Sequence, residues 1–299
     1  MIKPKLNREV RPYNSTNNIM KKIHLNLKCT LPAAAILFVS FFSACKKESS
    51  DPADDFQTSS QEIGLMESMN TEVDNMVAQA SQNGTINMRI SGNEDQYSMS
   101  SCAVITNDTV NGVLTIDFGS GCTGRDGRVR SGKIIITHSG GRYFDPGSTR
   151  SVTFDKFFVD STQIEGSRTV VNNGFNSSGN MNWTITATNM KITRPNGNWR
   201  SWNGQRTREM TAGYGDSTWV NDVYLINGSG SGTDHHGNTF STVTSNLVRD
   251  NSCHWIISGT ITFTPSNRPQ RIIDFGNGSC DDLATVTSNG VTRTIHLRR

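Results

Sequence analysis

The sequence has no apolar segment long enough to span a membrane and no excess of charge once its first 44 residues are set aside. Its most apolar run, Thr30–Ala44, has fifteen residues and contains Pro32, whereas a spanning helix needs about 20. Residues 1–44 hold seven of the 29 basic and one of the 26 acidic residues, so the other residues carry about −3. The sequence therefore predicts no nucleic-acid partner.

Motifs of the common enzyme classes are also missing. No GxSxG, HExxH, P-loop or GxGxxG motif occurs in a suitable context. Asp117 and Asp274 each precede a Gly-rich segment, where an Asp side chain typically accepts hydrogen bonds from turn N–H groups. From residue 85 onward the only glutamates are Glu94, Glu165 and Glu209. No two carboxylates have a spacing that suggests an acid–base pair, so we predict no catalytic residue and no cofactor.

Metal ligands are equally sparse. The sequence contains no CxxC, and the densest cluster of ligating residue types is Asp234-His235-His236-Gly237. Adjacent histidines in a strand point to opposite faces and cannot hold one ion unless the segment is a loop. The remaining histidines of residues 85–299 are scattered. We therefore predict solvated loop histidines and no metal site.

The N-terminal 44 residues have the organisation of an export signal. Lys21, Lys22 and Lys28 precede the apolar run, and Met20 is an alternative start that would give a signal of ordinary length. The run ends in Phe42-Ser43-Ala44-Cys45, which resembles the lipobox of bacterial lipoproteins, where the cysteine becomes the acylated first residue. We predict a signal peptide over 1–44 and lipidation of Cys45; an ordinary signal peptide beside a cysteine is the alternative.

A polar tether and one helix follow. Residues 45–57 are polar, contain Pro52 and predict a solvated tether. Ser59 to Glu62 fits a capping box, and the apolar residues after it recur at helical spacing. We predict one short amphipathic helix over residues 58–82. Its methionine-rich stripe suits either docking on its own protein or an adaptable partner surface.

Residues 85–299 have the pattern of an all-β domain. Apolar residues alternate with polar ones in segments such as MNWTITA and ISGTITF, and Asn-Gly turns separate the segments. No helical period long enough for a βαβ crossover occurs. We predict an antiparallel β-sandwich or an elongated meander built from repeated hairpin units.

An internal repeat bears on the cysteines. Asp117-Phe118-Gly119 recurs as Asp274-Phe275-Gly276, and each copy has one cysteine upstream and one just downstream. Cys29 leaves with the signal and Cys45 takes the lipid, so four cysteines remain, and four allow three disulfide connectivities. The repeat favours the two local bridges, Cys102–Cys122 and Cys253–Cys280.

One segment has the composition of a recognition surface. Residues 194–208, RPNGNWRSWNGQRTR, place two tryptophans in a segment rich in Asn, Gly and Arg. Aromatic faces beside such donors suit sugars or peptides. The candidate ligand patch comprises Trp199, Arg200, Trp202 and, from a second loop, Tyr143. The alternative is that the tryptophans fold over the end of the β core.

The chain also resembles a known family. WNGQRTREMTAGYG and VRDNSCHWIISGTITFTP, followed by IIDFGNGSCDDLATV, are similar to an uncharacterised family of Bacteroidota cell-envelope lipoproteins, over most of residues 101–297. The resemblance implies an exported, β-rich lipoprotein and supplies no activity, substrate or catalytic residue.

These features together predict a lipid-anchored protein of the cell envelope, at the outer membrane, with the periplasmic and surface faces both open. We expect a non-enzymatic binding or structural role, with a glycan or an envelope protein as partner and the membrane bound through the N-terminal lipid. The alternative is a secreted hydrolase that acts on polysaccharides.

Overall fold

In a computed structural model the chain divides into two compact units, residues 1–48 and 49–299. The structure describes residues 52–83, 102–124, 126–216 and 218–298, without the side chains of residues 52–56 and 83. All of these belong to the second unit. The predicted signal peptide, Cys45 and the start of the predicted tether lie outside the described residues.

The helix α1 spans Pro52–Asn83 and has 32 residues. The helix was predicted in the right place, but its start at residue 58 and its short length were wrong, since α1 includes the last six residues of the predicted tether. Pro52 accounts for the earlier start, because proline fits the first turn of a helix, where its missing N–H is not needed. Ser59 and Glu62 therefore lie inside α1, and both side chains contact arginines of the sheet.

Fourteen strands follow α1 in the described residues. Alternating apolar and polar residues give them one buried and one wetter face. Their bounds are β1 Val104–Asp108, β2 Val113–Asp117, β3 Cys122–Thr123, β4 Val129–Ser139, β5 Thr149–Val159, β6 Thr162–Phe175, β7 Met181–Thr193, β8 Trp199–Ala212, β9 Val223–Asp234, β10 Thr239–Asp250, β11 Ile256–Pro265, β12 Arg271–Asn277, β13 Leu283–Ser288 and β14 Val291–His296.

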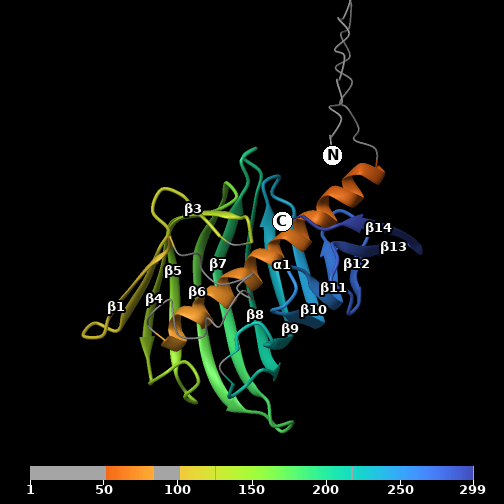
Figure 1. Ribbon diagram of the computed structural model, residues 1–299. Helices are drawn as coiled ribbons and strands as arrows, with labels where there is room; N and C mark the ends of the chain where they lie inside the picture. The colour runs from red at the N-terminus through yellow and green to blue at the C-terminus, as the bar shows by residue number, and fades with distance from the viewer. Residues whose placement is uncertain (1–51, 84–101, 125, 217, 299) are drawn as a thin grey trace, which may run out of the picture. The chain divides into compact units, whose positions relative to one another are not determined.

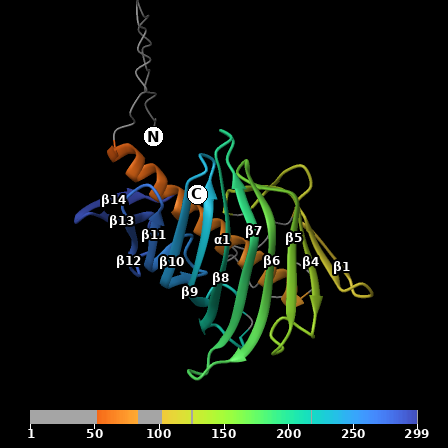
Figure 2. The same ribbon diagram turned by 180° about the vertical axis from the view of Figure 1, so that it is seen from behind.

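The strands form one open antiparallel sheet in chain order, from β1 and β2 through β4 to β14, and the short β3 pairs with β4. Each strand of this order pairs with its neighbours in the chain, as a succession of hairpins does. For the described residues the predicted all-β class with a single helix is confirmed, and of the two predicted architectures the structure has the meander. Figures 1 and 2 show α1 lying obliquely across one face of this sheet.

Two glycines show how the sheet curves around α1. Gly166 (φ 106°) on β6 faces Asn189 on β7, and Gly259 (φ 93°) on β11 faces Asn246 on β10. A Cβ atom would lie 2.5 Å from the Asn189 carbonyl oxygen at Gly166 and 2.2 Å from the Asn246 carbonyl oxygen at Gly259, so both positions require glycine. The strand register shifts at both places, as in β-bulges, and such bulges bend strands.

The hydrophobic core lies between α1 and the concave face of the sheet. Met66, Met69 and Met76 are 4%, 1% and 4% exposed, so the methionine stripe packs against its own protein. At the edge of the sheet formed by β14, the Gln61 side chain of α1 donates a hydrogen bond to the His296 carbonyl oxygen (2.9 Å). Among the described residues, α1 is the one helix, and its sequence is not apolar enough to cross a bilayer.

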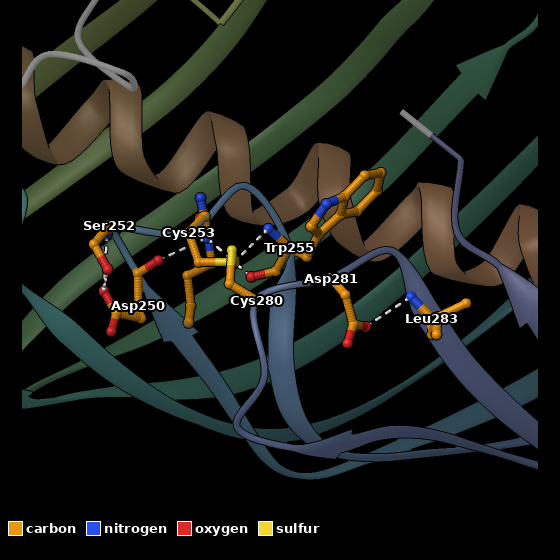
Figure 3. Close-up of a disulfide and its surroundings, with 8 residues drawn as sticks. Asp250, Ser252, Cys253, Trp255, Cys280, Asp281 and Leu283 are labelled. Carbon is orange, nitrogen blue, oxygen red and sulfur yellow. Dashed lines mark hydrogen bonds between the residues drawn. A yellow bond between two sulfur atoms is a disulfide. The ribbon is translucent and has the colours of Figure 1, made fainter.

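Two disulfides close the two copies of the internal repeat. Cys102–Cys122 encloses the β1–β2 hairpin, and Cys253–Cys280 encloses the β11–β12 hairpin, as the repeat predicted. Figure 3 shows the second bridge, where the Trp255 backbone N–H donates to the Cys253 sulfur (3.4 Å). In each copy the phenylalanine of the Asp-Phe-Gly sequence is buried, Phe118 at 2% and Phe275 at 3% exposure.

Candidate functional site

The predicted ligand patch is not one exposed surface. Trp202 and Arg200 are 6% and 9% exposed and lie on the inner face of β8, whereas Trp199, three residues from Trp202, lies on the opposite face. Tyr143 is also buried and stacks on Trp183, with ring centroids 5.2 Å apart. The prediction was wrong because the segment after residue 198 is a strand and not a loop, so consecutive side chains alternate between faces.

Burial of the aromatic cluster also has an electrostatic effect. Burial raises the pKa of the Tyr143 hydroxyl to about 12, although the nearby Arg208 opposes the shift. Arg208 lies directly over the Tyr224 ring, 3.5 Å from its centroid, and is 1% exposed. Tyr143 is therefore a packing residue of the core, and it has no place in a surface site.

The inner face of the sheet meets α1 through a set of ion pairs, here called the arginine interface. Four acidic residues of α1 take part, and each is paired with arginine. Glu62 pairs with Arg200 (2.7 Å) and Arg194 (3.5 Å), Glu67 with Arg206 (2.7 Å), Glu72 with Arg130 (2.5 Å) and Arg128, and Asp74 with Arg168 (2.9 Å) and Arg206.

Burial shifts the protonation of this interface. Glu67 is 5% exposed, and desolvation raises the pKa of its carboxyl group even though Arg206 favours the ionised form. Burial would also raise the pKa of Asp126, but the hydrogen bonds and charge of Arg130 outweigh it and lower that pKa. Glu67 is therefore held closer to its neutral form than an ordinary glutamate.

A cavity lies beside the first turns of α1, where Thr58, Ser59 and Glu62 face the sheet. This end cavity has a volume of about 180 Å³ and lies beside the β9–β10 and β11–β12 turns, near the start of β8. Its lining includes three arginines and two histidines together with a helix carboxylate: Arg200, Arg268, Arg271, His235, His236 and Glu62.

The apolar floor of the end cavity includes Phe263, and two guanidinium groups lie near its ring. Arg200 lies 5.8 Å and Arg271 5.9 Å from the centroid of its ring, within the range of a cation–π contact. Arg271 is 4% exposed and donates to the Ser59 hydroxyl of α1. Burial, and then repulsion from Arg268 and Arg200, lower the pKa of Arg271 to about 10.

The rim of the end cavity is built by two linked turns. Asp234 accepts hydrogen bonds from the backbone N–H groups of His236 (2.9 Å) and Asn238 (3.0 Å), which fixes the β9–β10 turn. Asn267 of the β11–β12 turn donates to the Asn238 side-chain oxygen (3.0 Å). His235 and His236, which were predicted to lie in a loop, therefore belong to a hydrogen-bonded turn that lines the end cavity. Their ring centroids are 3.8 Å apart.

No group of three or more His, Cys, Asp or Glu side chains within the described residues could hold a metal ion. Asp234 already accepts hydrogen bonds within its own turn. Burial alone would raise its pKa, but the hydrogen bonds with Asn238 and His236 outweigh burial and lower it. The chemistry available at the end cavity is that of cationic and amide donors around an apolar floor.

Two smaller cavities flank α1. The first, of about 60 Å³, is lined by Glu72, Arg128, Arg130 and Trp255, among others. The second, of about 50 Å³, lies between Glu67 of α1 and the glycines of β8 and β9, Gly204, Gly228 and Gly230. Neither has room for more than about two water molecules.

Sequence reasoning missed most of these residues. Glu62, Glu67, Glu72 and Asp74 are spaced along one helix that has no basic residue after Pro52, and that acidic bias is a signal for cationic partners. The alternating glycines Gly228, Gly230 and Gly232 are a second signal, because period-two spacing places all three on one face of a strand. The pairing of particular arginines with these acids has no signal in the sequence.

The fold and the site define a class of protein: an open antiparallel meander that encloses an acidic helix and carries an arginine-lined cavity at one end. Comparison of the chain with protein-family models, with curated proteins and with solved structures finds no match. The resemblance to Bacteroidota lipoproteins therefore stays a prediction.

Proposed function

We propose that the protein is a lipid-anchored lipoprotein of the cell envelope whose sheet has a non-enzymatic binding role. The lipobox at Cys45 supports the anchor. The two disulfides support export, because disulfides persist in oxidising compartments. The outer membrane, with a glycan or an envelope protein as partner, is our proposed setting.

The observation that carries the proposal is the short connection between the anchor and the fold. Six residues separate Cys45 from Pro52, where α1 begins, so this connection spans at most about 25 Å when fully extended. Arginines of the sheet hold α1 in place at four acidic positions. An acylated Cys45 would therefore limit how far the start of α1, and the fold that follows it, can move from the bilayer.

The state of the carboxylates supports binding over catalysis. In the end cavity Glu62 is paired with two arginines, and the pKa of Asp234 is lowered. A hydrolase of the retaining or inverting type needs one carboxylic acid that keeps its proton near neutral pH beside a second carboxylate. The described lining of the end cavity does not supply that pair.

The test of the anchor is metabolic labelling with palmitate in a bacterial host that processes lipoproteins. We expect label in the parent chain and none in Cys45→Ser, with the parent in the membrane fraction. Cys253→Ser serves as a control for the loss of a cysteine elsewhere and should keep the label. Equal labelling of the parent and Cys45→Ser, or no labelling of either, would contradict the proposal.

One observation favours the hydrolase alternative. Glu67 has a raised pKa and lines the glycine-lined cavity, and shifted carboxyl groups beside cavities often mark active sites. If Glu67 were a general acid, Glu67→Gln would abolish release of reducing ends from envelope polysaccharides while the fold stayed intact. We expect the parent to release none, because Glu67 is enclosed by α1 and β8.

A further inference from the structure

We propose that the end cavity binds one uncharged sugar residue, such as the chain end of a glycan. The proposal deepens the binding role proposed above and rests on it, because it names a class of ligand for that role. It is carried by three asparagines that three neighbouring turns bring to one enclosed space beside an aromatic side chain.

The meander places every second turn at the same end of the sheet. The β7–β8, β9–β10 and β11–β12 turns are therefore neighbours, because β8 pairs with β9 and β10 pairs with β11. Each of these turns contributes one asparagine to the lining of the end cavity, namely Asn198, Asn238 and Asn267. The first belongs to the segment 194–208, which the sequence marked as suited to sugars or peptides. Three amide groups from separate turns thus line a common space.

Two of these turns have the same backbone construction. In the β7–β8 turn, the Arg194 N–H donates to the Asn198 carbonyl oxygen (2.9 Å), and the Asn198 N–H donates to the Asn196 side chain (3.1 Å). In the β9–β10 turn, the Asp234 N–H donates to the Asn238 carbonyl oxygen (3.0 Å). The backbone of both asparagines is therefore held before any ligand arrives, which reduces the entropy lost on binding.

The lining keeps side chains that can bond to a ligand. Within the described residues, the Asn198 side chain has no hydrogen-bond partner, and an amide can both donate and accept. The imidazoles of His235 and His236 contact each other, and a neutral imidazole also has one donor and one acceptor. A sugar hydroxyl group donates and accepts as well, so these side chains match the groups around a sugar ring.

The charged side chains of the lining are engaged within the protein, which favours an uncharged ligand. Glu62 pairs with Arg200 (2.7 Å), and Asp234 accepts hydrogen bonds from its own turn. Arg271 donates to a hydroxyl group of α1, and Arg268 is not free either. An anion would have to compete for guanidinium groups that already interact with the protein, whereas a sugar can use the amides and imidazoles.

The apolar part and the size of the cavity fit a single sugar ring. Phe263 and Pro265 of β11 line the cavity together with the amides, and the C–H groups of a sugar pack against such side chains. The volume of about 180 Å³ equals that of about six water molecules. One sugar ring has this size, so the cavity accepts one residue and leaves the rest of a glycan outside.

The test is a glycan array probed with the full chain in a zwitterionic detergent. One set of immobilised glycans ends in neutral hexoses, deoxyhexoses or N-acetylhexosamines, and a second set ends in sialic acid, uronic acids or sulfated sugars. We expect the neutral set to give the stronger binding. The methyl glycoside of the terminal sugar that binds best should compete with the array, because one residue fills the cavity.

Two variants test the cavity itself. Asn198→Ala removes an amide and keeps the backbone hydrogen bonds of its turn, and His236→Ala removes an imidazole and keeps the N–H that Asp234 binds. The matched control is Asn180→Ala in the β6–β7 turn at the opposite end of the sheet, where the Asn180 N–H likewise donates to an asparagine side chain (2.9 Å). We expect each cavity variant to weaken binding of the methyl glycoside about five- to tenfold and the control to leave it unchanged.

Four results would overturn the site. They are no binding to the neutral set, equal or stronger binding to the charged set, no competition by the methyl glycoside, and equal binding by the parent, Asn198→Ala and His236→Ala when circular dichroism shows all three folded. Glycan binding that survives both variants would leave the binding role in place and remove the cavity from it. The array does not require the lipid, so its outcome and that of the palmitate test are independent.

Discussion

At the scale of single residues, Glu67 shows how burial and pairing compete. Its carboxylate lies 2.7 Å from Arg206, which favours the charged form, yet desolvation is the larger effect and raises its pKa. A carboxyl group whose pKa is higher in the folded than in the unfolded state binds its proton more tightly on folding. Its contribution to stability is therefore fully present below the ordinary glutamate pKa, and it is lost as the pH rises from that value through the raised pKa of the folded state.

Glu67→Gln removes this dependence, because the amide keeps the shape of the side chain and does not ionise. We expect the melting temperature of Glu67→Gln, measured relative to that of the parent, to rise as the pH increases above the ordinary glutamate pKa. Arg206 keeps Asp74 as a partner in the variant. Circular dichroism melts at several pH values measure the difference; a difference that stays constant with pH would show that the shift in pKa is absent.

The role of a residue could be predicted from the sequence when its contacts are with residues close to it in the chain. The turn role of Asp117 and Asp274 was predictable, since each accepts a hydrogen bond from the N–H two residues further on, at 2.8 and 2.9 Å. The burial of Trp202 was not, because the inward face of β8 is set by α1, a segment more than a hundred residues away. Local rules fix a turn, whereas tertiary packing decides which face is covered.

At the scale of elements, α1 is held by charge as well as by its apolar stripe. The apolar period was enough to predict the helix. Its true start and its partners were not predictable, because the acidic residues of α1 meet arginines from β4, β6 and β8. The strongest test is Asp74, whose side chain is 3% exposed and is bound by Arg168 and Arg206.

Asp74→Asn should destabilise the protein by about 3–5 kcal/mol, because it leaves Arg168 and Arg206 buried without that counter-charge. The matched control is Glu165→Gln, which breaks an exposed pair with Lys191 at 3.8 Å and should cost less than about 1 kcal/mol. Urea unfolding measures both. Similar losses in the two variants would mean that burial adds nothing to the pair at Asp74.

The inner face of β9 is made of glycines where it passes β8. A Cβ atom at Gly228 would lie 2.5 Å from the Gln205 carbonyl oxygen and 2.7 Å from the Arg206 Cα atom. Gly228→Ala should therefore cost about 1–3 kcal/mol, since backbone must move. Ser229→Ala, on the exposed face of the same strand, should change stability by less than about 0.5 kcal/mol. Equal thermal stability of the two variants would contradict the close approach.

At the scale of the whole folded unit, the internal repeat was the most informative feature of the sequence. It predicted both disulfides and the hairpins that they close. It did not predict that a single sheet holds both copies, nor that one helix serves as the inner layer for strands from β2 to β14. Those relations are non-local, and a pattern of alternating residues is the same in a sandwich and in a meander.

Removing the bridge between Cys253 and Cys280 with a double serine variant should cost about 3.5 kcal/mol, because the bridge closes a segment of 27 residues in the unfolded chain. The variant without Cys102 and Cys122, which are separated by 20 residues, should lose a similar amount. Urea unfolding of the oxidised proteins measures both effects. A loss near zero in either variant would show that the corresponding bridge does not constrain the chain.

The position of α1 at the start of the folded unit has a consequence for biosynthesis. Ribosomes make the chain from the N-terminus, so α1 is completed long before Arg206 and His296, which bind Glu67 and Gln61. Until β14 has been synthesised, some of the strands that bury the acidic and apolar side chains of α1 do not yet exist. Native folding of this unit must therefore follow its synthesis rather than accompany it, and until then α1 is a segment that chaperones or proteases can reach.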